Sequence, residues 1–427
     1  MSLPSPHLMN TSERYDQYIL PTYGRFPVEF VRGEGSRLWD KDGNEFLDFC
    51  TGIAVCSIGH SHPRLTVALT EAAQNLQHVS NLYHIPAQAE LAELIVEKFV
   101  RLPGRLFFAN SGAEANDGLI KSARKYGHLK PMEDGSPRYE VLTFNQSFHG
   151  RTLGSMAATG QDKIKAGFDP MLPGFRHLPF NDLAAVEAAI APETVAIMLE
   201  PIQGEGGIRV AEDQFLHGLA DLCKKHDLLL FFDEVQCGFG RTGNRCAWRS
   251  IAPEVVPDGL SWAKGMGGGV PIGSFWLSDR VIDADGTRFS DLLGPGTHGS
   301  TYGGNPLCSA ASLAVLSEIH DKELWTAAFK KGQLVHELLA ENHPKAIKEL
   351  RGLGLMLGFE IDAEQIKVPE GQTPALTVVK ALMANGLLTV PAGPDTVRWL
   401  PPLNVTDEEI QKAFTILTAT LNELAKA

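Results

Sequence analysis

The sequence predicts an α/β fold in which a mostly parallel sheet, covered by helices on both faces, is joined to a smaller α+β domain. Between about residues 60 and 320, short apolar runs alternate with segments of helical periodicity, which is typical of βαβ units. The run Leu228–Phe232 holds five large apolar residues without alternation, as expected for a strand buried on both faces. Beyond residue 320 the order changes to mixed helices and short strands. This change places a domain boundary near residues 310–320. We expect residues 61–312 to form a large domain and residues 313–427 a C-terminal small α+β domain, with residues 1–60 as an N-terminal arm and part of the small domain.

Local signals predict the individual elements along the chain. Aromatic residues mixed with prolines before residue 35 predict an extended arm that packs on another surface, such as a second subunit. Two short runs in Ser36–Asp48 around Gly43 predict a β-hairpin. Pro63 predicts a helix start, and we do not interpret His60 and His62 as metal ligands, because no third ligand lies at a useful spacing. Apolar spacing predicts helices at about residues 63–76, 87–99, 213–226, 306–319, 322–341, 374–385 and 406–425, and strands at about 106–109, 141–144, 195–199, 270–277, 351–361, 387–390 and 396–400.

Composition excludes several classes of protein. The hydrophobic share of 44% and the charged share of 21% are those of an ordinary globular protein. The net charge of −13 argues against nucleic acid or an anionic membrane as a partner. We find no apolar run long enough to span a bilayer and expect no signal peptide at the N-terminus. The six cysteines are scattered without a CxxC pair, which predicts reduced thiols in a cytoplasmic protein.

A predicted strand at 106–109 runs directly into Ser111, Gly112 and Ala113, which open a helix. Ser111 and Glu114 have the spacing of a capping box. The N-terminus of a helix that follows a strand is a ready anion site, because free N–H groups and the helix dipole both face the turn. The alternative is a capped helix without a ligand.

Asp233 ends the predicted central strand, and Lys264 lies 31 residues further along, beside glycines. Ligands of open α/β sheets bind beyond the carboxyl ends of the strands. A buried lysine loses part of its preference for the charged form and becomes a usable nucleophile. Taken singly, the two residues are also explained as a turn aspartate and a solvated lysine. Together they provide what pyridoxal phosphate requires, an amine for its aldehyde and a carboxylate for its ring nitrogen.

Two further patterns in the sequence each allow more than one interpretation. Residues 238–243 match G-x-G-x-x-G and offer a nicotinamide-dependent dehydrogenase as a rival. We decline it because Asp233 and Glu234 would bring negative charge to a pyrophosphate and no long amphipathic helix follows. Phe148, at a strand end, can stack on a flat ring, and Arg151 offers a planar fork for a carboxylate. The alternative is a core phenylalanine and a surface arginine.

These motifs together resemble the class-III pyridoxal-phosphate-dependent aminotransferases of fold type I, whose architecture is like that of aspartate aminotransferase. The resemblance covers nearly the whole chain, from Leu38 to Pro402. It implies a homodimer in which each active site is shared between the subunits. The stretches that carry it are Ser80–Tyr83, Phe148–Gly154, Ala158–Gln161, Leu172–Phe175 and His298–Pro306.

The resemblance implies a set of cofactor contacts. Lys264 would bind the cofactor aldehyde covalently and, once displaced by substrate, carry the transferred proton. Asp233 would pair with the ring nitrogen and keep it protonated. Gln236 would contact the ring hydroxyl, and Val235 and Phe148 would contact the two faces of the ring. The phosphate would be bound by Ser111, Gly112 and Ala113, together with Thr301 of the partner subunit.

The resemblance also implies how two different substrates share one site. Arg151 would hold the α-carboxylate, with Ser300 nearby. Glu205 and Arg398 would form a switch pair, in which the arginine binds the second carboxylate of glutamate and is neutralised by Glu205 when the amine donor binds. This suits a two-stage ping-pong reaction. The sequence does not determine whether Glu205 and Arg398 contact each other in the absence of substrate.

Within the family, the chain most resembles the branch that moves the δ-amino group of N2-acetylornithine to 2-oxoglutarate, giving the semialdehyde and glutamate, as in arginine synthesis. Ornithine, succinylornithine, 4-aminobutyrate or a diaminopimelate precursor are alternative donors. An aminomutase, which would need no oxo-acid acceptor, is a more remote alternative. Trp262 and Cys237 depart from the family pattern, although neither has an implied role.

Overall fold

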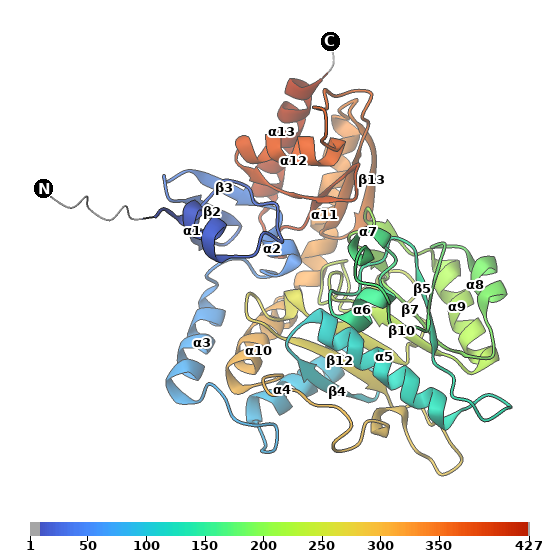
Figure 1. Ribbon diagram of the computed structural model, residues 1–427. Helices are drawn as coiled ribbons and strands as arrows, with labels where there is room; N and C mark the ends of the chain where they lie inside the picture. The colour runs from blue at the N-terminus through green and yellow to red at the C-terminus, as the bar shows by residue number, and fades with distance from the viewer. Residues whose placement is uncertain (1–8, 426–427) are drawn as a thin grey trace, which may run out of the picture.

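The computed structural model describes residues 9–425 and is built around a seven-stranded sheet of order β4-β12-β11-β10-β7-β5-β6 (Figure 1). Strands β11, β10, β7, β5 and β6 are parallel to one another, and β12 is antiparallel to both β11 and β4. The predicted mostly parallel sheet is confirmed. The strands are β4 (Gly104–Ala109), β5 (Glu140–Phe144), β6 (Phe175–Leu178), β7 (Thr194–Leu199), β10 (Leu229–Asp233), β11 (Gly259–Trp262) and β12 (Gly273–Ser278).

The central strand β10 is buried on both faces. Leu230 and Phe232 join the apolar cluster that contains α9 (Asp213–His226), whereas Leu229 and Phe231 join the cluster that contains α5 (Gly112–Leu129). Successive side chains of a strand point to opposite faces, so helices must cover both sides of the sheet. This explains the unbroken apolar run that the sequence shows. The other helices around the sheet are α4 (Pro86–Leu94), α6 (Leu153–Ala158), α7 (Asp162–Lys165), α8 (Leu183–Ala189) and α10 (Pro306–Asp321).

A second, antiparallel sheet of order β13-β14-β17-β16 lies near the C-terminus. The single strand expected at 351–361 is wrong, because β13 (Ile347–Leu353) and β14 (Met356–Ile361) form a tight hairpin. Gly352 and Gly354 take positive φ angles of 114° and 56°, which glycine adopts at little cost. The surrounding elements are α11 (Leu324–Glu341), α12 (Pro374–Ala384), β16 (Val390–Ala392), β17 (Thr396–Trp399) and α13 (Asp407–Leu424).

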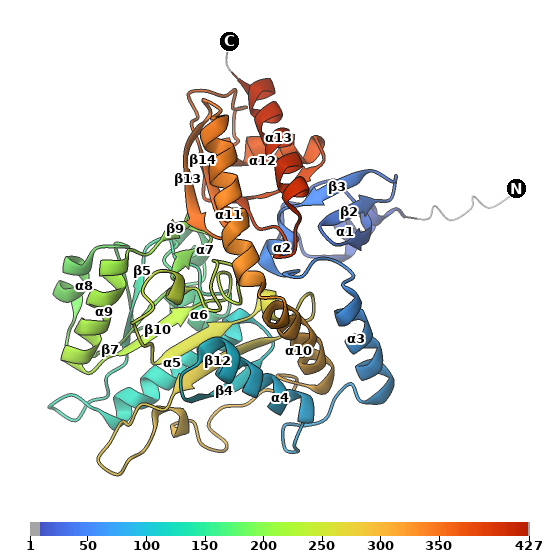
Figure 2. The same ribbon diagram turned by 180° about the vertical axis from the view of Figure 1, so that it is seen from behind.

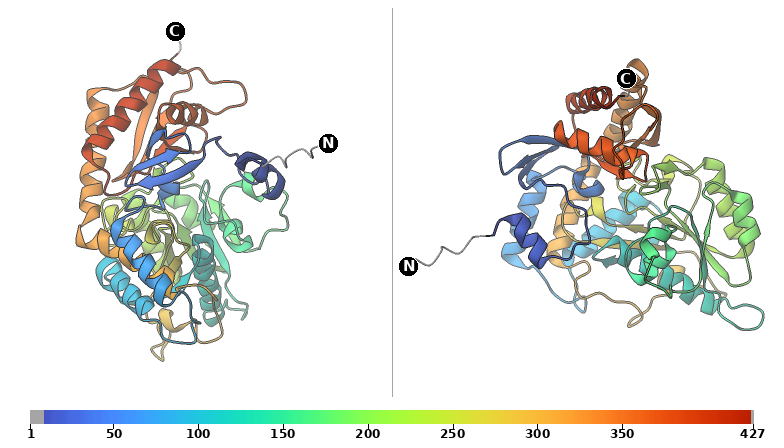
Figure 3. Two further views of the ribbon diagram at one scale, coloured as in Figure 1. Left: turned by 90° about the vertical axis from the view of Figure 1, so that its left-hand side faces the viewer. Right: turned by 45° about the horizontal axis from the view of Figure 1, so that its top comes forward.

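The N-terminal strands lie against this C-terminal part (Figure 3). The predicted hairpin is confirmed as β2 (Arg37–Asp40) and β3 (Glu45–Asp48), and β15 (Leu387–Leu388) pairs with β3 in parallel. The arm is not wholly extended, because a capping box of Asn10 and Glu13 opens a helix, α1 (Thr11–Tyr18). The remaining elements here are β1 (Phe30–Glu34), α2 (Thr51–Ala54) and α3 (Pro63–Asn75), and short strands β8 (Ile202–Gln203) and β9 (Arg209–Val210) pair elsewhere in the chain.

The structure bears on the expectation about membrane-spanning segments but not on the expectation about a signal peptide. Across residues 9–425, every helix is too short or too polar to cross a bilayer. The expectation of no signal peptide concerns residues 1–8, which lie outside the described range.

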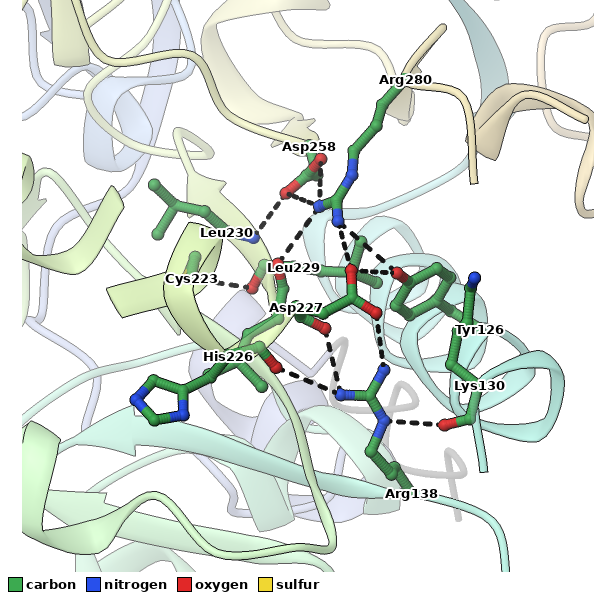
Figure 4. Close-up of polar contacts among 11 residues, drawn as sticks. Tyr126, Lys130, Arg138, Cys223, His226, Asp227, Leu229, Leu230, Asp258 and Arg280 are labelled. Atoms are coloured by element: carbon green, nitrogen blue, oxygen red, sulfur yellow. Dashed lines mark hydrogen bonds and ion pairs between the residues drawn. The ribbon is translucent and has the colours of Figure 1, made fainter. Parts of the chain in front are cut away.

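A polar cluster ties together the edge of the seven-stranded sheet where β10 and β11 begin (Figure 4). Arg280 binds Asp227 at 2.6 Å and Asp258 at 3.2 Å, and Arg138 binds the other oxygen of Asp227 at 3.3 Å. Tyr126 donates its hydroxyl to Asp227 at 2.7 Å. Asp258 also accepts the N–H of Leu230 at 2.9 Å, so the cluster fixes strand ends remote from Asp233.

Replacing Arg280 by methionine is expected to lower the free energy of unfolding by about 3 kcal/mol, because breaking a buried pair leaves an uncompensated charge. Burial raises the pKa of Asp258 while Arg280 lowers it, so the loss of Arg280 leaves the burial cost unopposed. Urea unfolding measures the effect. Lys225→Met, which removes one partner of an exposed pair with Glu187, is the control and should cost less than about 1 kcal/mol. Equal losses in both variants would contradict the argument.

Candidate active site

The predicted site residues gather at the carboxyl edge of the seven-stranded sheet. Asp233 is the last residue of β10 and pairs in register with Ser261 of β11. Lys264 is separated from the end of β11 by Ala263 alone and opens a short 3-10 turn, Lys264–Met266. Ser111 follows β4 and caps α5. Three segments far apart in sequence therefore meet where ligands of α/β sheets bind.

Asp233 is held by a buried hydrogen-bond network. One carboxylate oxygen accepts the side-chain amide of Asn116 at 2.7 Å and Nδ1–H of His149 at 2.8 Å. The other oxygen accepts the backbone N–H of Val235 at 3.0 Å. Ser261 in turn donates to Asn116 at 2.5 Å. Burial by itself lowers the pKa of His149, but the hydrogen bond and charge of Asp233 outweigh it and the pKa is raised. The network therefore fixes the Asp233 carboxyl group beside an imidazole whose pKa it raises.

Lys264 occupies an unusual backbone position close to that anion. Its φ is 43°, a left-handed value that costs energy for a residue with a Cβ. Ser57 donates to the carbonyl of the next residue, Gly265, at 2.6 Å and helps to hold the turn. Burial lowers the pKa of the Lys264 amine, and Arg398 lowers it further, against the opposing effect of Glu205. A larger neutral fraction makes the amine a better nucleophile.

The start of α5 is built to leave N–H groups available. The first N–H that bonds a backbone carbonyl of the helix is that of Ala115, to Ser111, at 3.1 Å. Gly112 and Ala113 precede it, and N–H groups of the first turn lack intrahelical partners. A Cβ on Gly112 would stand 2.8 Å from Val235, so glycine is required for the approach of α5 to the end of β10.

The expected capping box at this helix is only half formed. Ser111 Oγ accepts the N–H of Glu114 at 3.2 Å, as predicted. The Glu114 carboxylate bonds the backbone and side chain of Asn110, at 2.6 and 2.9 Å, rather than the N–H of Ser111. Ser111 therefore caps the helix through its side chain alone.

Arg398 and Glu205 form a closed pair, which answers the question left open by the sequence. Nη1 of Arg398 donates to Glu205 at 2.8 Å, to the Gln236 side-chain carbonyl at 2.7 Å and to the Gly204 carbonyl at 3.0 Å. Arg398 is fully buried. Burial raises the pKa of Glu205, but Arg398 outweighs it and the pKa is lowered. Glu205 is therefore a carboxylate that neutralises the arginine.

The remaining predicted residues lie around this centre in two groups. Phe148 bonds Glu200 through its backbone N–H at 3.0 Å, and Arg151 lies with its Cζ 5.5 Å from the Phe148 ring centroid and is exposed. Ser300 accepts hydrogen bonds from Asn110 and Gly303 rather than contacting Arg151. Thr301 is exposed. The chain thus brings Asp233, Lys264, Gln236, Glu205 and Arg398 together, but not Ser300 with Arg151.

Sequence reasoning missed Asn116 and His149, which bond Asp233, and also Glu200, whose charge interacts with those of His149 and Asp233. Glu200 accepts the N–H groups of Phe148 and Gly204 at 3.0 and 3.1 Å, and burial raises its pKa to about 7. Glu200 follows the buried strand β7 as Asp233 ends β10, so the same signal could have found it. Asn116 is a polar residue on the buried face of α5, which was a second available signal.

Trp262, which departs from the family pattern, has a partner on the other side of β10. Its indole N–H donates to Glu234 at 3.2 Å, and the backbone N–H of Trp248 donates to the same carboxylate at 2.9 Å. Burial raises the pKa of Glu234 to about 7. The tryptophan therefore satisfies a buried carboxyl group next to Asp233 without touching Asp233.

Comparisons with known proteins agree with this geometry. The family model described as Aminotransferase class-III matches residues 18–421. An acetylornithine aminotransferase of Synechocystis sp. is 44% identical to the chain, and the match covers 96% of the chain and 93% of that relative. One of Caldanaerobacter subterraneus subsp. tengcongensis is 45% identical, and the match covers 96% of the chain and 98% of that relative. Among solved structures, an ornithine aminotransferase from Toxoplasma gondii has a TM-score of 0.87 at 32% identity, covering 98% of this chain and 96% of that one. An N-acetylornithine aminotransferase from Stenotrophomonas maltophilia has a TM-score of 0.76 at 34% identity, covering 96% and 98%.

Proposed function

Because the chain belongs to the class-III aminotransferases, we propose that it transfers the δ-amino group of N2-acetyl-L-ornithine to 2-oxoglutarate, using pyridoxal 5'-phosphate. The products are N-acetyl-L-glutamate 5-semialdehyde and L-glutamate, as arginine synthesis requires. The relatives that carry the name acetylornithine aminotransferase support this donor. The observation in the structure that carries the proposal is the closed Glu205–Arg398 pair beside Lys264.

The residues at the carboxyl ends of the strands fit pyridoxal phosphate. A fixed carboxylate, Asp233, is backed by the raised pKa of His149, which suits a protonated ring nitrogen. The open start of α5, where Gly112 lies close to Val235, suits a phosphate beside a flat ring. Lys264 supplies an amine of lowered pKa. When bound, the cofactor supplies an aldehyde that takes up the amino group and a cationic ring that stabilises negative charge at the substrate carbon.

We assign the following tasks to the chain's own residues. Lys264 would hold the cofactor aldehyde, and its amine would remove the proton from the donor carbon. Asp233 would hold a proton on the ring nitrogen. Val235 and Phe148 would limit access of water to the ring, and Gln236 would bind the ring hydroxyl. Ser111, Gly112 and Ala113 would bind the phosphate.

The charges around the closed pair favour an acylated donor. With Arg398 neutralised by Glu205, the exposed Arg151 near Phe148 is the cation left for the donor's single carboxylate. N2-acetylation removes the charge of the α-amino group, so that this group needs no carboxylate partner. Free ornithine brings a second ammonium that would require one. 2-Oxoglutarate instead brings a second carboxylate, which Arg398 binds once Glu205 moves away.

A panel of amine donors with 2-oxoglutarate tests the proposed function. We expect N2-acetylornithine to give the highest kcat/KM, ahead of succinylornithine, ornithine and 4-aminobutyrate. A tenfold preference for free ornithine would overturn the choice of donor. Product formation without any oxo acid would instead support an aminomutase.

Glu205→Gln is expected to separate the two half-reactions. The variant leaves Arg398 without its carboxylate partner, so kcat/KM for N2-acetylornithine should fall about tenfold, while the half-reaction with glutamate, which uses the free arginine, should be retained or improved. Single-turnover rates of each half-reaction measure the split. An equal loss in both would show that Glu205 acts only as structural support.

We also propose that the active unit is a homodimer. Leu82, Tyr83 and Tyr302 are 88%, 68% and 63% exposed, and Asn81 joins their two loops by donating to the carbonyls of Ser300 and Gly303. Clustered exposed apolar side chains mark interaction surfaces. Thr301 of the partner subunit would complete the phosphate site and Ser300 the substrate site.

A mixing experiment tests the sharing of sites. Thr301→Glu should block phosphate binding, and Lys264→Ala should block covalent binding of the cofactor. If each site takes Thr301 from the partner subunit, reassociation of the two inactive variants restores one intact site per mixed dimer, giving about a quarter of normal activity for random pairing. Each variant reassociated with itself is the control. No recovery despite confirmed mixing would refute the shared site.

The domain boundaries and the cellular location are each supported by one feature of the chain. We propose that residues 61–312 form a large domain, and that residues 1–60 join residues 313–427 in a small one, as the pairing of β3 with β15 supports. We propose a cytoplasmic location, because all six cysteines are free and thiols persist in reducing compartments.

A further inference from the structure

A cavity of about 380 Å³ lies away from the candidate active site, between α11, the turn of the β13–β14 hairpin and the loop of residues 242–250. Figure 2 shows α11 beside β13 and β14. None of the candidate active-site residues lines this cavity, so the cavity is separate from the site of amino transfer. Its volume falls within the range of ordinary small-molecule sites.

Close backbone contacts hold the walls of the cavity in place. A Cβ on Gly332 of α11 would stand 2.4 Å from the carbonyl oxygen of Gly354, and one on Gly354 would stand 2.6 Å from that of Arg241. The three segments therefore touch through glycines at one end of the cavity. Arg241 is buried and donates to the carbonyls of Leu355 and Pro401, which fastens the same end.

The lining supplies cationic and neutral donors and contains no carboxylate of its own, although the charge of Arg249 also acts on the buried Glu234 behind it. Arg249 is half-buried, donates to the Val100 carbonyl at 2.8 Å, and forms no ion pair with any described residue. Gln333 and His336 reach the cavity from exposed positions of α11. No aspartate or glutamate of residues 9–425 lines it, although the chain has 51 acidic residues and a net charge of −13.

An apolar wall completes the cavity. Phe329 is 51% exposed, which leaves much of a large aromatic side chain in contact with solvent, and Leu353 lies in the lining with it. A cavity with one apolar wall and a few convergent polar groups is the usual form of a small-molecule site.

We propose that this cavity binds a small carboxylic acid with an apolar body. The carboxylate pairs with the guanidinium of Arg249 and accepts from the Gln333 amide, since charge-assisted hydrogen bonds to arginine are the strong ones. The apolar body covers Phe329 and Leu353 and removes their surface from water. Because the walls come from α11 and from the loop that follows β10, the ligand ties these two segments together.

Fluorine NMR of 4-fluorobenzoate with the holoenzyme tests the proposal, in saturating 2-oxoglutarate so that the substrate site is occupied. We expect the fluorine signal to broaden on binding and the melting temperature to rise. Gln333→Glu places a carboxylate at the cavity and should weaken binding about tenfold or more by like-charge repulsion. Gln411→Glu makes the same chemical change on an exposed position of α13 and should leave binding unchanged.

Neutral 4-fluorobenzamide, of nearly the same shape, should bind much more weakly than the acid. The proposal is overturned if the acid does not bind, if the amide binds equally well, or if Gln333→Glu and Gln411→Glu bind alike. Because Gln333 lies away from the sheet edge, both variants should keep the transaminase activity of the unmodified protein. That activity shows that the variants are folded, and it tests the proposed function separately.

Discussion

Lys264→Ala is expected to abolish amino transfer and covalent retention of the cofactor. Burial lowers the pKa of the Lys264 amine, which lies beyond the carboxyl end of β11. Its removal would eliminate both the proposed covalent attachment and the proposed general base. Loss of a general base alone slows a reaction by about 10²–10⁴-fold. Because the covalent attachment of the cofactor is lost as well, turnover should fall by at least this factor. Glutamate formation, the visible absorption of the holoenzyme and borohydride fixation of the cofactor measure the result.

Lys165→Ala is the matched control. Burial also lowers the pKa of Lys165, but its amine lies 2.6 Å from His177 and outside the site. This variant should keep the absorption band and most of the activity. Retention of the band and of borohydride labelling in Lys264→Ala would refute the role of Lys264, because another amine would then hold the cofactor.

Asp233→Asn is expected to leave the fold nearly intact and to lower kcat by about 10³-fold, the size of effect seen when one preorganised electrostatic group is lost. The amide is neutral and no longer favours a protonated ring nitrogen. His149 also loses the carboxylate that raises its pKa, so that burial, which lowers the pKa, prevails. Proton removal should become more strongly rate-limiting. A larger isotope effect with donor deuterated at the δ-carbon would measure this change.

Glu234→Gln separates this effect from the general cost of altering a buried acid. Glu234 adjoins Asp233 in sequence, is equally buried, and bonds Trp262 and Trp248 instead of the network of His149. Its amide variant should change kcat by less than about tenfold. If Asp233→Asn were no slower than Glu234→Gln, the proposed role of Asp233 would be wrong.

The fold and the positions of Asp233 and Lys264 at the carboxyl ends of the strands were predictable because their signals are local. The apolar run of β10 required burial on both faces, and the positions of Asp233 and Lys264 followed from the rule that ligands bind at the carboxyl edge. The hairpin at Gly43 and the helix at Pro63 were also confirmed. The errors arose where one residue changes the outcome, as at Gly354, where a positive φ turns one expected strand into two.

The amino-acid sequence by itself determined most of the strands and helices and which two residues, an acid and a lysine, lie at the carboxyl ends of the strands, because periodicity and strand ends are properties of short segments. Only the tertiary structure decided the partners of those residues. Asn116 and His149 reach Asp233 from 117 and 84 positions away, and Glu205 closes on Arg398 across 193. Hydrogen bonds act over about 3 Å, so such pairs form only after the chain has folded.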